Sequence, residues 1–190
     1  MEKKYRLLEN DTKTVNGKTL YRIEALKDFT NVKKGDKGGY IESEDNLSHI
    51  GNCWVSDNAE IFGNACVFDN ARVFGYACVF DNARVDGNAQ VYGNTRVFGY
   101  AQVYGYAEVY GDAEVRSTRD YVVLKNIWSS GRYFTYTRSN KMWKVGCFYG
   151  TGEELIAKAY RDSEVSGREY KRVVEYVEAM YADLENDESK

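Results

Sequence analysis

The sequence predicts a mainly β protein in which short parallel strands stack into coils, with a β lead-in before them and a small α+β unit after them. Residues 51–116 divide into eleven six-residue units with the consensus Gly/Asp, Asn/Tyr, Ala, any residue, Val, aromatic. The fifth position is Val in every unit but one, which has Ile61. A fixed period of this kind is the signature of repeat architectures, in which each unit packs on its neighbours.

The residue types at each position of the unit explain how it folds. The β-branched Val suits a buried strand position, and the Ala at the third position is small enough to turn inward at a corner. Gly or Asp followed by Asn is turn chemistry, because these residues tolerate positive φ. Each unit is therefore one short strand and one corner, and stacked coils bury the Val side chains that one unit cannot bury alone.

The flanking segments contain strand, turn and helix signals instead of the repeat. In residues 1–50, Asn16-Gly17 predicts a type I′ hairpin turn. In residues 117–190 we expect three strands, joined by turns at Ser129–Gly131 and Ser139–Lys141, within the sequences DYVVLKNI, GRYFTYTR and MWKVGCF. The chain is thus expected to divide into residues 1–50, 51–116 and 117–190.

Two capping-box sequences predict two helices near the C-terminus. The first is Thr151–Glu154 and the second is Ser166–Glu169. After the second, apolar residues recur at helical spacing, namely Tyr170, Val173, Val174, Val177 and Tyr181.

Composition excludes several classes of protein. The net charge of −3 argues against a strongly basic nucleic-acid surface, and the single histidine excludes a multi-histidine zinc site. No apolar run approaches the ~20 residues that a membrane span needs. The N-terminus is charged from its second residue on, unlike a secretory signal. We therefore expect a cytoplasmic protein without a metal, whose four cysteines are reduced thiols.

The V-x-G-N-A-x pattern resembles that of hexapeptide-repeat proteins, whose fold is a left-handed parallel β-helix with three six-residue units per coil. The handedness is implied by this resemblance alone. The stretch YRIEALKDFTNVKKGDKGGYIESEDNLSHIGNCWV resembles the lead-in of hexapeptide-repeat proteins common in phages and prophages, and CFYGTGEELIAKAY resembles their C-terminal appendix. The resemblance implies a phage-type protein that acts in the host cytoplasm.

Many hexapeptide-repeat proteins are acyltransferases that use acetyl-CoA and a general-base histidine. Here the candidate base is His49, just before the first regular unit. The units run without an inserted loop, and they carry four arginines against eight acidic residues. We expect His49 to be a rim residue, because a fold does not by itself carry an activity.

The sixth position of the unit offers the better candidate surface, since it lies next to an inward Val and points outward. Residues 18 apart form three predicted ladders: Phe62, Phe80 and Phe98; Phe74, Tyr92 and Tyr110; and Phe68, Asp86 and Tyr104. Stacked rings stabilise neighbouring coils, but exposed apolar patches also mark contact surfaces, where aromatic residues are enriched. We expect these aromatic residues to bind a protein partner.

The sequence therefore predicts a non-enzymatic phage-type accessory protein that binds a protein through its aromatic ladders or its C-terminal unit. The partner is, for instance, a host protein of antiviral defence that it inhibits. We also expect it to form a homo-oligomer, either a dimer or a trimer. One alternative is an acetyl-CoA-dependent acyltransferase with His49 as base in a cleft between subunits. The other is a sponge that sequesters a small ligand in pockets where protomers meet.

Overall fold

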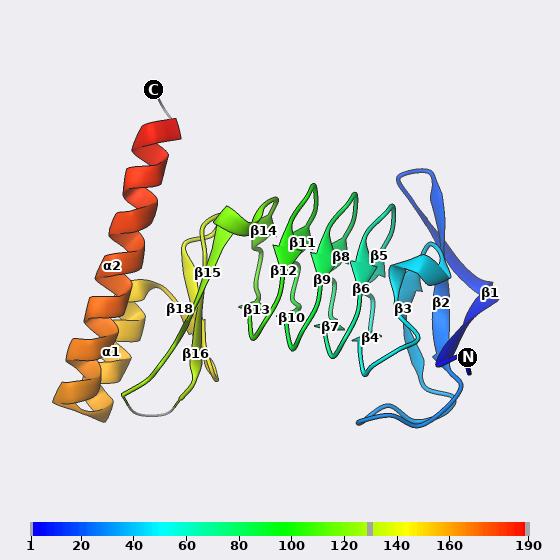
Figure 1. The fold of residues 1–190 in the computed structure, drawn as a ribbon, viewed down its shortest axis with the longest axis horizontal. Helices are drawn as coiled ribbons and strands as arrows, with labels where there is room; N and C mark the ends of the chain where they lie inside the picture. Colours follow the sequence, from blue (N-terminus) through cyan, green and yellow to red (C-terminus); the bar gives the residue numbers. More distant parts are fainter. Residues whose placement is uncertain (1, 129–130, 189–190) are drawn as a thin grey trace. The chain divides into compact units, whose positions relative to one another are not determined.

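The computed structural model describes residues 2–128 and 131–188 (Figure 1). The chain divides into two compact units, of which the first ends at Asp120 and the second begins at Tyr121. The lead-in and the coils share the first unit, because the lead-in strands continue a sheet of the coils. The mainly β architecture, with parallel stacked coils and a C-terminal α+β unit, is confirmed.

The lead-in is an antiparallel hairpin followed by a strand that joins it to the coils. Strands β1 (Tyr5–Val15) and β2 (Lys18–Ala25) are connected by Asn16 and Gly17, both with positive φ, as a type I′ turn requires. Strand β3 (Lys37–Ile41) pairs antiparallel with β2 and parallel with the first coil. It therefore starts the parallel stack before the six-residue repeat begins.

Two-residue strands form three faces of about four coils, which we call the solenoid, and each strand pairs in parallel with the one 18 residues further on (Figure 1). The first face consists of β5 (Glu60–Ile61), β8 (Cys78–Val79), β11 (Arg96–Val97) and β14 (Glu114–Val115). The second face consists of β4 (Trp54–Val55), β7 (Arg72–Val73), β10 (Gln90–Val91) and β13 (Glu108–Val109). The third face consists of β6 (Cys66–Val67), β9 (Arg84–Val85) and β12 (Gln102–Val103).

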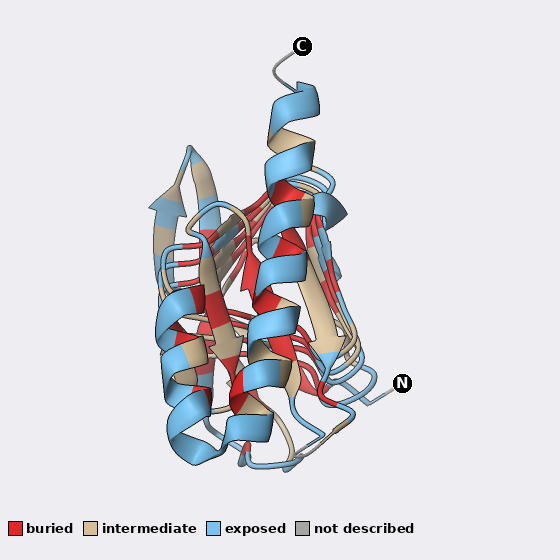
Figure 2. Ribbon diagram, turned by 90° about the vertical axis from the view of Figure 1, so that its left-hand side faces the viewer, coloured by how far each residue is buried: buried red, intermediate tan, exposed pale blue. Residues whose placement is uncertain are grey.

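The interior of the solenoid is a column of small and β-branched side chains. Every fifth-position Val or Ile is fully buried, as is nearly every third-position Ala. In Figure 2 the buried residues recur at the same places from coil to coil. The unit at residues 93–98 has Thr95 in place of Ala, and its buried hydroxyl donates to the carbonyl oxygen of Tyr92 at 2.7 Å. The buried hydroxyl of Thr95 therefore has a hydrogen-bond partner within the solenoid.

The corners use aspartate or glycine where the chain enters the left-handed region. Asp57, Asp69 and Asp81 have φ between 56° and 59°, and glycine takes this place in the other units. The carboxylate of each of these aspartates accepts a hydrogen bond from the backbone N–H of the glycine one coil further on, at 3.0 to 3.3 Å. Each aspartate thus offsets the cost of its left-handed backbone by linking two coils.

The second unit contains a four-stranded antiparallel sheet where the sequence predicts three strands. The strands are β15 (Tyr121–Lys125), β16 (Tyr133–Thr137), β17 (Met142–Val145) and β18 (Phe148–Gly150). The segment predicted as one strand turns back at Gly146, whose φ is +55°, and so forms both β17 and β18. The predicted turn Ser129–Gly131 falls largely outside the described residues.

Two helices complete the second unit. Helix α1 (Gly152–Asp162) begins with the predicted capping box, in which Thr151 accepts from the N–H of Glu154 and Glu154 accepts from that of Thr151. Helix α2 (Glu164–Glu188) begins before the predicted second box, because Ser163 accepts from the N–H of Ser166. The prediction of Ser166 as the start was therefore wrong, and Ser166 lies within the helix.

The core of the second unit lies between the sheet and the two helices. Its buried side chains are Phe134, Tyr136, Trp143, Val145, Leu155, Val174, Val177 and Tyr181. The two helices approach closely at Gly167, where an added Cβ would lie 2.2 Å from the ring of Tyr160. No helix within residues 2–128 and 131–188 is both long and apolar enough to cross a membrane.

Ile61→Ala should destabilise the solenoid strongly. The side chain is fully buried in the Val column, so its removal leaves a cavity and should lower the free energy of unfolding by about 2–5 kcal/mol. Urea denaturation followed by circular dichroism measures this change. Ile50→Ala is the matched control, since Ile50 is 64% exposed and its truncation should change stability by less than about 0.5 kcal/mol. Equal effects of the two substitutions would contradict the packing described above.

Candidate functional site

Two of the three predicted ladders form continuous ring stacks. On the first face, Phe80 lies parallel to Phe62 and Phe98, with centroid distances of 5.2 and 5.0 Å. On the second face, Tyr92 stacks on Phe74 and Tyr110, at 4.5 Å each. The stacking predicted from the 18-residue spacing is confirmed, whereas a part for these rings in binding stays a prediction.

The stacked rings are largely covered by their own neighbours. Phe62 is only 5% exposed, and the other rings of the two stacks are half-buried. The guanidinium of Arg96 lies over Phe80 and Phe98, and that of Arg116 also lies over Phe98. Parallel rings and overlying cations both stabilise the contact between coils. The first face therefore presents cationic side chains over part of its aromatic surface.

The second face also shows the effect of burial on a tyrosine hydroxyl. Burial raises the pKa of Tyr92, and the carboxylate of Glu108, 3.4 Å from the hydroxyl, raises it further. The hydroxyl therefore stays protonated, and it links β10 to β13 as a hydrogen-bond donor.

The third face differs because Asp86 interrupts its ladder. The guanidinium of Arg84 lies 5.0 Å from the centre of the Phe68 ring, in place of a stacked aromatic ring. Burial and the nearby Asp69 raise the pKa of Asp86. Tyr104, one coil further on than Asp86, is 53% exposed. Without continuous stacking, the last aromatic side chain of this face stays accessible.

Tyr104 belongs to a group of exposed tyrosines on either side of strand β12. Tyr100 and Tyr106, at the two corners that flank β12, are 80% and 50% exposed. We call Tyr100, Tyr104 and Tyr106 the tyrosine row. Tyr76 is also exposed, at 68%, but lies at the corner that follows the second face.

The predicted binding set contained Tyr104 but not Tyr100 or Tyr106. The signal is visible in the repeat, because the units GYAQVY and GYAEVY have Tyr where most units have Asn. In the corner columns, asparagines 18 residues apart bond to each other, as Asn52 does to Asn70 and Asn64 to Asn82. Tyr100 follows Asn82 by 18 residues, so it occupies the position of the next asparagine in the column of Asn64 and Asn82.

The structure places His49 within the lead-in, packed against the first strand. Its Nδ1 accepts a hydrogen bond from the backbone N–H of Lys4 at 3.1 Å, and its Nε2 lies 3.4 Å from the carboxylate of Glu44. Its ring stacks on Tyr5 with a centroid distance of 4.3 Å. Because Nδ1 accepts, Nε2 carries the proton of the neutral ring. Both nitrogens are thus engaged in holding the lead-in together.

The buried thiols are less acidic than a free cysteine. Burial raises the pKa of Cys78 to about 12, with Glu60 adding to the shift. Burial also raises the pKa of Cys53, although the ammonium of Lys4, 3.2 Å away, opposes the change. Cys147 is exposed. No cluster of metal-ligating side chains occurs among the described residues.

No family model matches this chain, and a search of curated proteins found no match.

Phe80→Leu should cost more stability than Phe68→Leu. Both rings are half-buried, but Phe80 stacks on two rings and Phe68 on none of the described ones. Loss of two aromatic pairs should lower the free energy of unfolding by about 1–3 kcal/mol, in addition to the loss from the smaller buried apolar area. Denaturant titration of both variants measures the difference, and similar losses would show that the stacks add nothing to the coils.

Labelling with an aromatic disulfide reagent at about pH 8 should modify Cys147 first. Because the thiolate is the reactive form, a pKa of about 12 lowers the reactivity of Cys78 by on the order of a thousandfold relative to a free thiol. Mass spectrometry of labelled peptides over time tests this order. Cys147→Ser should remove the fast phase, and a fast phase that persists would contradict it.

Proposed function

We propose that this protein is a non-enzymatic binding protein that holds a protein partner against the third face of its solenoid. The observation that carries the proposal is the tyrosine row, three exposed aromatic side chains that flank strand β12. Tyrosine is enriched at binding hot spots, because it brings a large contact area and a hydroxyl with few rotatable bonds.

The surroundings of the row also suit an interface. Arg84 and Asp86, one coil before Gln102 and Tyr104, place both charge signs beside the rings. Asparagines occupy the corner positions one coil before Tyr100 and Tyr106. Aromatic residues bordered by polar and charged groups are typical of protein–protein interfaces. The coils beneath the row are joined by backbone hydrogen bonds, so little ordering is needed on binding.

The resemblance to hexapeptide-repeat proteins of phages extends this proposal. On that basis the solenoid is left-handed, and the protein is an accessory protein that acts in the host cytoplasm and inhibits a host protein of antiviral defence. Self-association into a dimer or a trimer is part of the same proposal.

The placement of His49 supports a non-enzymatic function over the acetyl-CoA-dependent alternative. A general base needs a lone pair directed at the acceptor substrate, whereas Nδ1 of His49 accepts from the backbone of Lys4. A ligand-sequestering sponge makes a different prediction, namely that a small molecule is retained from lysate in the absence of a protein partner.

The double substitution Tyr100→Ser/Tyr104→Ser should abolish partner binding, and circular dichroism checks that the variant is folded. Removal of two hot-spot rings typically costs several kcal/mol of binding free energy, at about 2 kcal/mol or more for each ring. The tagged protein is purified from bacterial lysate under gentle conditions, and native mass spectrometry measures the added mass and the oligomeric state.

Tyr76→Ser is the matched control, because the exposure of Tyr76, 68%, lies between those of Tyr100 and Tyr104, and Tyr76 is outside the row. An added protein mass that persists in Tyr76→Ser and disappears in the double variant supports the proposal. Binding that survives the double variant would place the interface elsewhere. A small retained molecule with no added protein would favour the sponge.

A further inference from the structure

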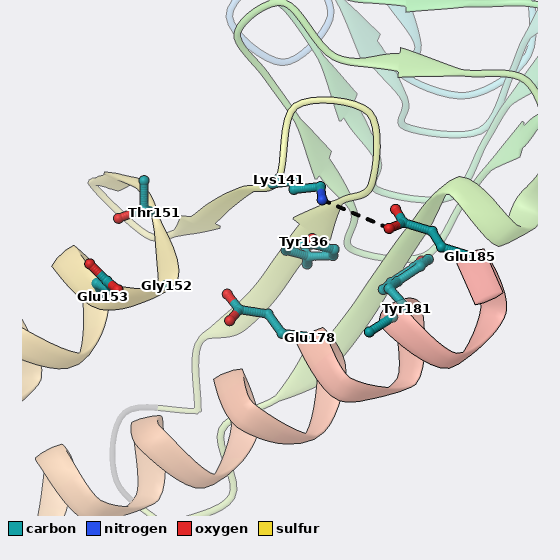
Figure 3. A pocket seen from close by; sticks show the side chains of 9 residues that line it. Tyr136, Lys141, Thr151, Gly152, Glu153, Glu178, Tyr181 and Glu185 are labelled. Atoms are coloured by element: carbon teal, nitrogen blue, oxygen red, sulfur yellow. Dashed lines mark ion pairs between the residues drawn. The ribbon is translucent and has the colours of Figure 1, made fainter.

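The second unit contains a pocket of about 370 Å³ between its sheet and its helices (Figure 3). Strand β16, the turn after it, the first turn of α1 and the C-terminal half of α2 form its walls. The side chains that matter for its chemistry are Tyr136, Lys141, Glu153, Glu178, Tyr181 and Glu185. A pocket of this size suits a small organic group.

The charges in the pocket are not balanced. Three carboxylates line it, and of these Glu185 lies 3.8 Å from the ammonium of Lys141 (Figure 3) and 3.8 Å from the guanidinium of Arg138, which also lies over the ring of Tyr181. Glu178 accepts a hydrogen bond from the indole N–H of Trp143 at 3.3 Å. Among the described residues, no cationic side chain pairs with Glu153 or Glu178. The pocket therefore has two carboxylates without a counter-charge, both on exposed residues at its rim.

Tyr136 supplies a second, independent observation. Its side chain is only 3% exposed, yet the described part of the chain offers no hydrogen-bond partner to its hydroxyl. The hydroxyl is not enclosed by protein but opens onto the pocket, so it is available to form a hydrogen bond with a molecule that enters. Burial raises the pKa of Tyr136 to about 12, with Glu178 and Glu185 adding to the shift. The hydroxyl is thus neutral, and its oxygen can accept a hydrogen bond.

The chemistry of the pocket favours an organic cation over a metal ion. The described residues contain no group of three carboxylate, thiol or imidazole side chains placed to hold one ion. The rings of Tyr136 and Tyr181, with centroids 5.2 Å apart, add aromatic surface that attracts a cation. An extended cation with several N–H donors can reach groups that are too far apart to share a metal.

We propose that this pocket binds a guanidinium or alkylammonium group, donated by a small organic cation or by a basic side chain of a peptide. The N–H donors of the group would pair with Glu153 and Glu178 and satisfy the hydroxyl of Tyr136. This site is separate from the third face of the solenoid and does not depend on the function proposed for that face.

The test is an amide NMR titration of the full chain with butylguanidinium, using neutral butylurea as the isosteric control. We expect saturable shifts of signals around the pocket, such as those of Gly152 and Glu153, with butylguanidinium only. Equal shifts with butylurea, or no saturable shift with butylguanidinium, would overturn the proposal.

Two variants connect the binding to the pocket. Glu178→Gln keeps an oxygen for Trp143 but removes the charge, and it should weaken binding on the order of tenfold. Tyr136→Phe removes only an unpartnered oxygen, so the fold is retained while binding should weaken about threefold. Glu175→Gln is the control on the same helix, because Glu175 pairs with Lys171 and does not line the pocket. A Glu178→Gln variant that binds as well as the control would overturn the assignment.

The same titration with a short arginine-containing peptide, capped at both ends, separates the two sources of the cation. Tighter binding of the peptide than of butylguanidinium supports a basic side chain of a partner, and the reverse order supports a free small cation. Both results support the binding of an organic cation in the pocket, whereas failure of both probes to bind would overturn this proposal.

Discussion

The stacking of 18-residue coils in register is the constraint on which the first unit depends. Each coil buries its Val and Ala side chains only because the next coil covers them, and hydrogen bonds between coils hold each residue over its counterpart. The same register places like side chains in columns on the outside. Ring stacks, asparagine ladders and aspartate–glycine bonds between corners are therefore consequences of one spacing.

This register also decides which aromatic side chains are accessible. Where rings follow one another at 18-residue spacing, as at Phe62, Phe80 and Phe98, they cover each other and contribute to stability. Where Asp86 interrupts the column, Tyr104 is 53% exposed. In a regular repeat, stacked rings would bury one another. The irregularity at Asp86 leaves aromatic surface exposed on the third face, which is why this face is the candidate binding face.

The second unit follows different principles. Its core forms between a sheet and two helices, and side chains from β16, α1 and α2 converge although they are far apart in the chain. Periodicity identified the buried side of α2 through Val174, Val177 and Tyr181. The number of strands depended on the turn at Gly146. The first residue of α2 depended on the cap at Ser163. In both places the local sequence allows more than one boundary, and tertiary packing selects one of them. The opening of the Tyr136 hydroxyl onto a pocket has no sequence signature.

The sequence alone determined the architecture of the coils, because a six-residue period with inward Val leaves few ways to bury the apolar side chains. Which residues share a ladder followed once the resemblance to hexapeptide-repeat proteins supplied three units per coil, since this number sets the 18-residue spacing. The tertiary structure decided how exposed each ring is, because exposure depends on what lies over it. It alone brought His49 against Tyr5 and Lys4, and gathered Glu153, Glu178 and Tyr136 around one pocket, because contacts between distant segments are set by packing and not by local pattern.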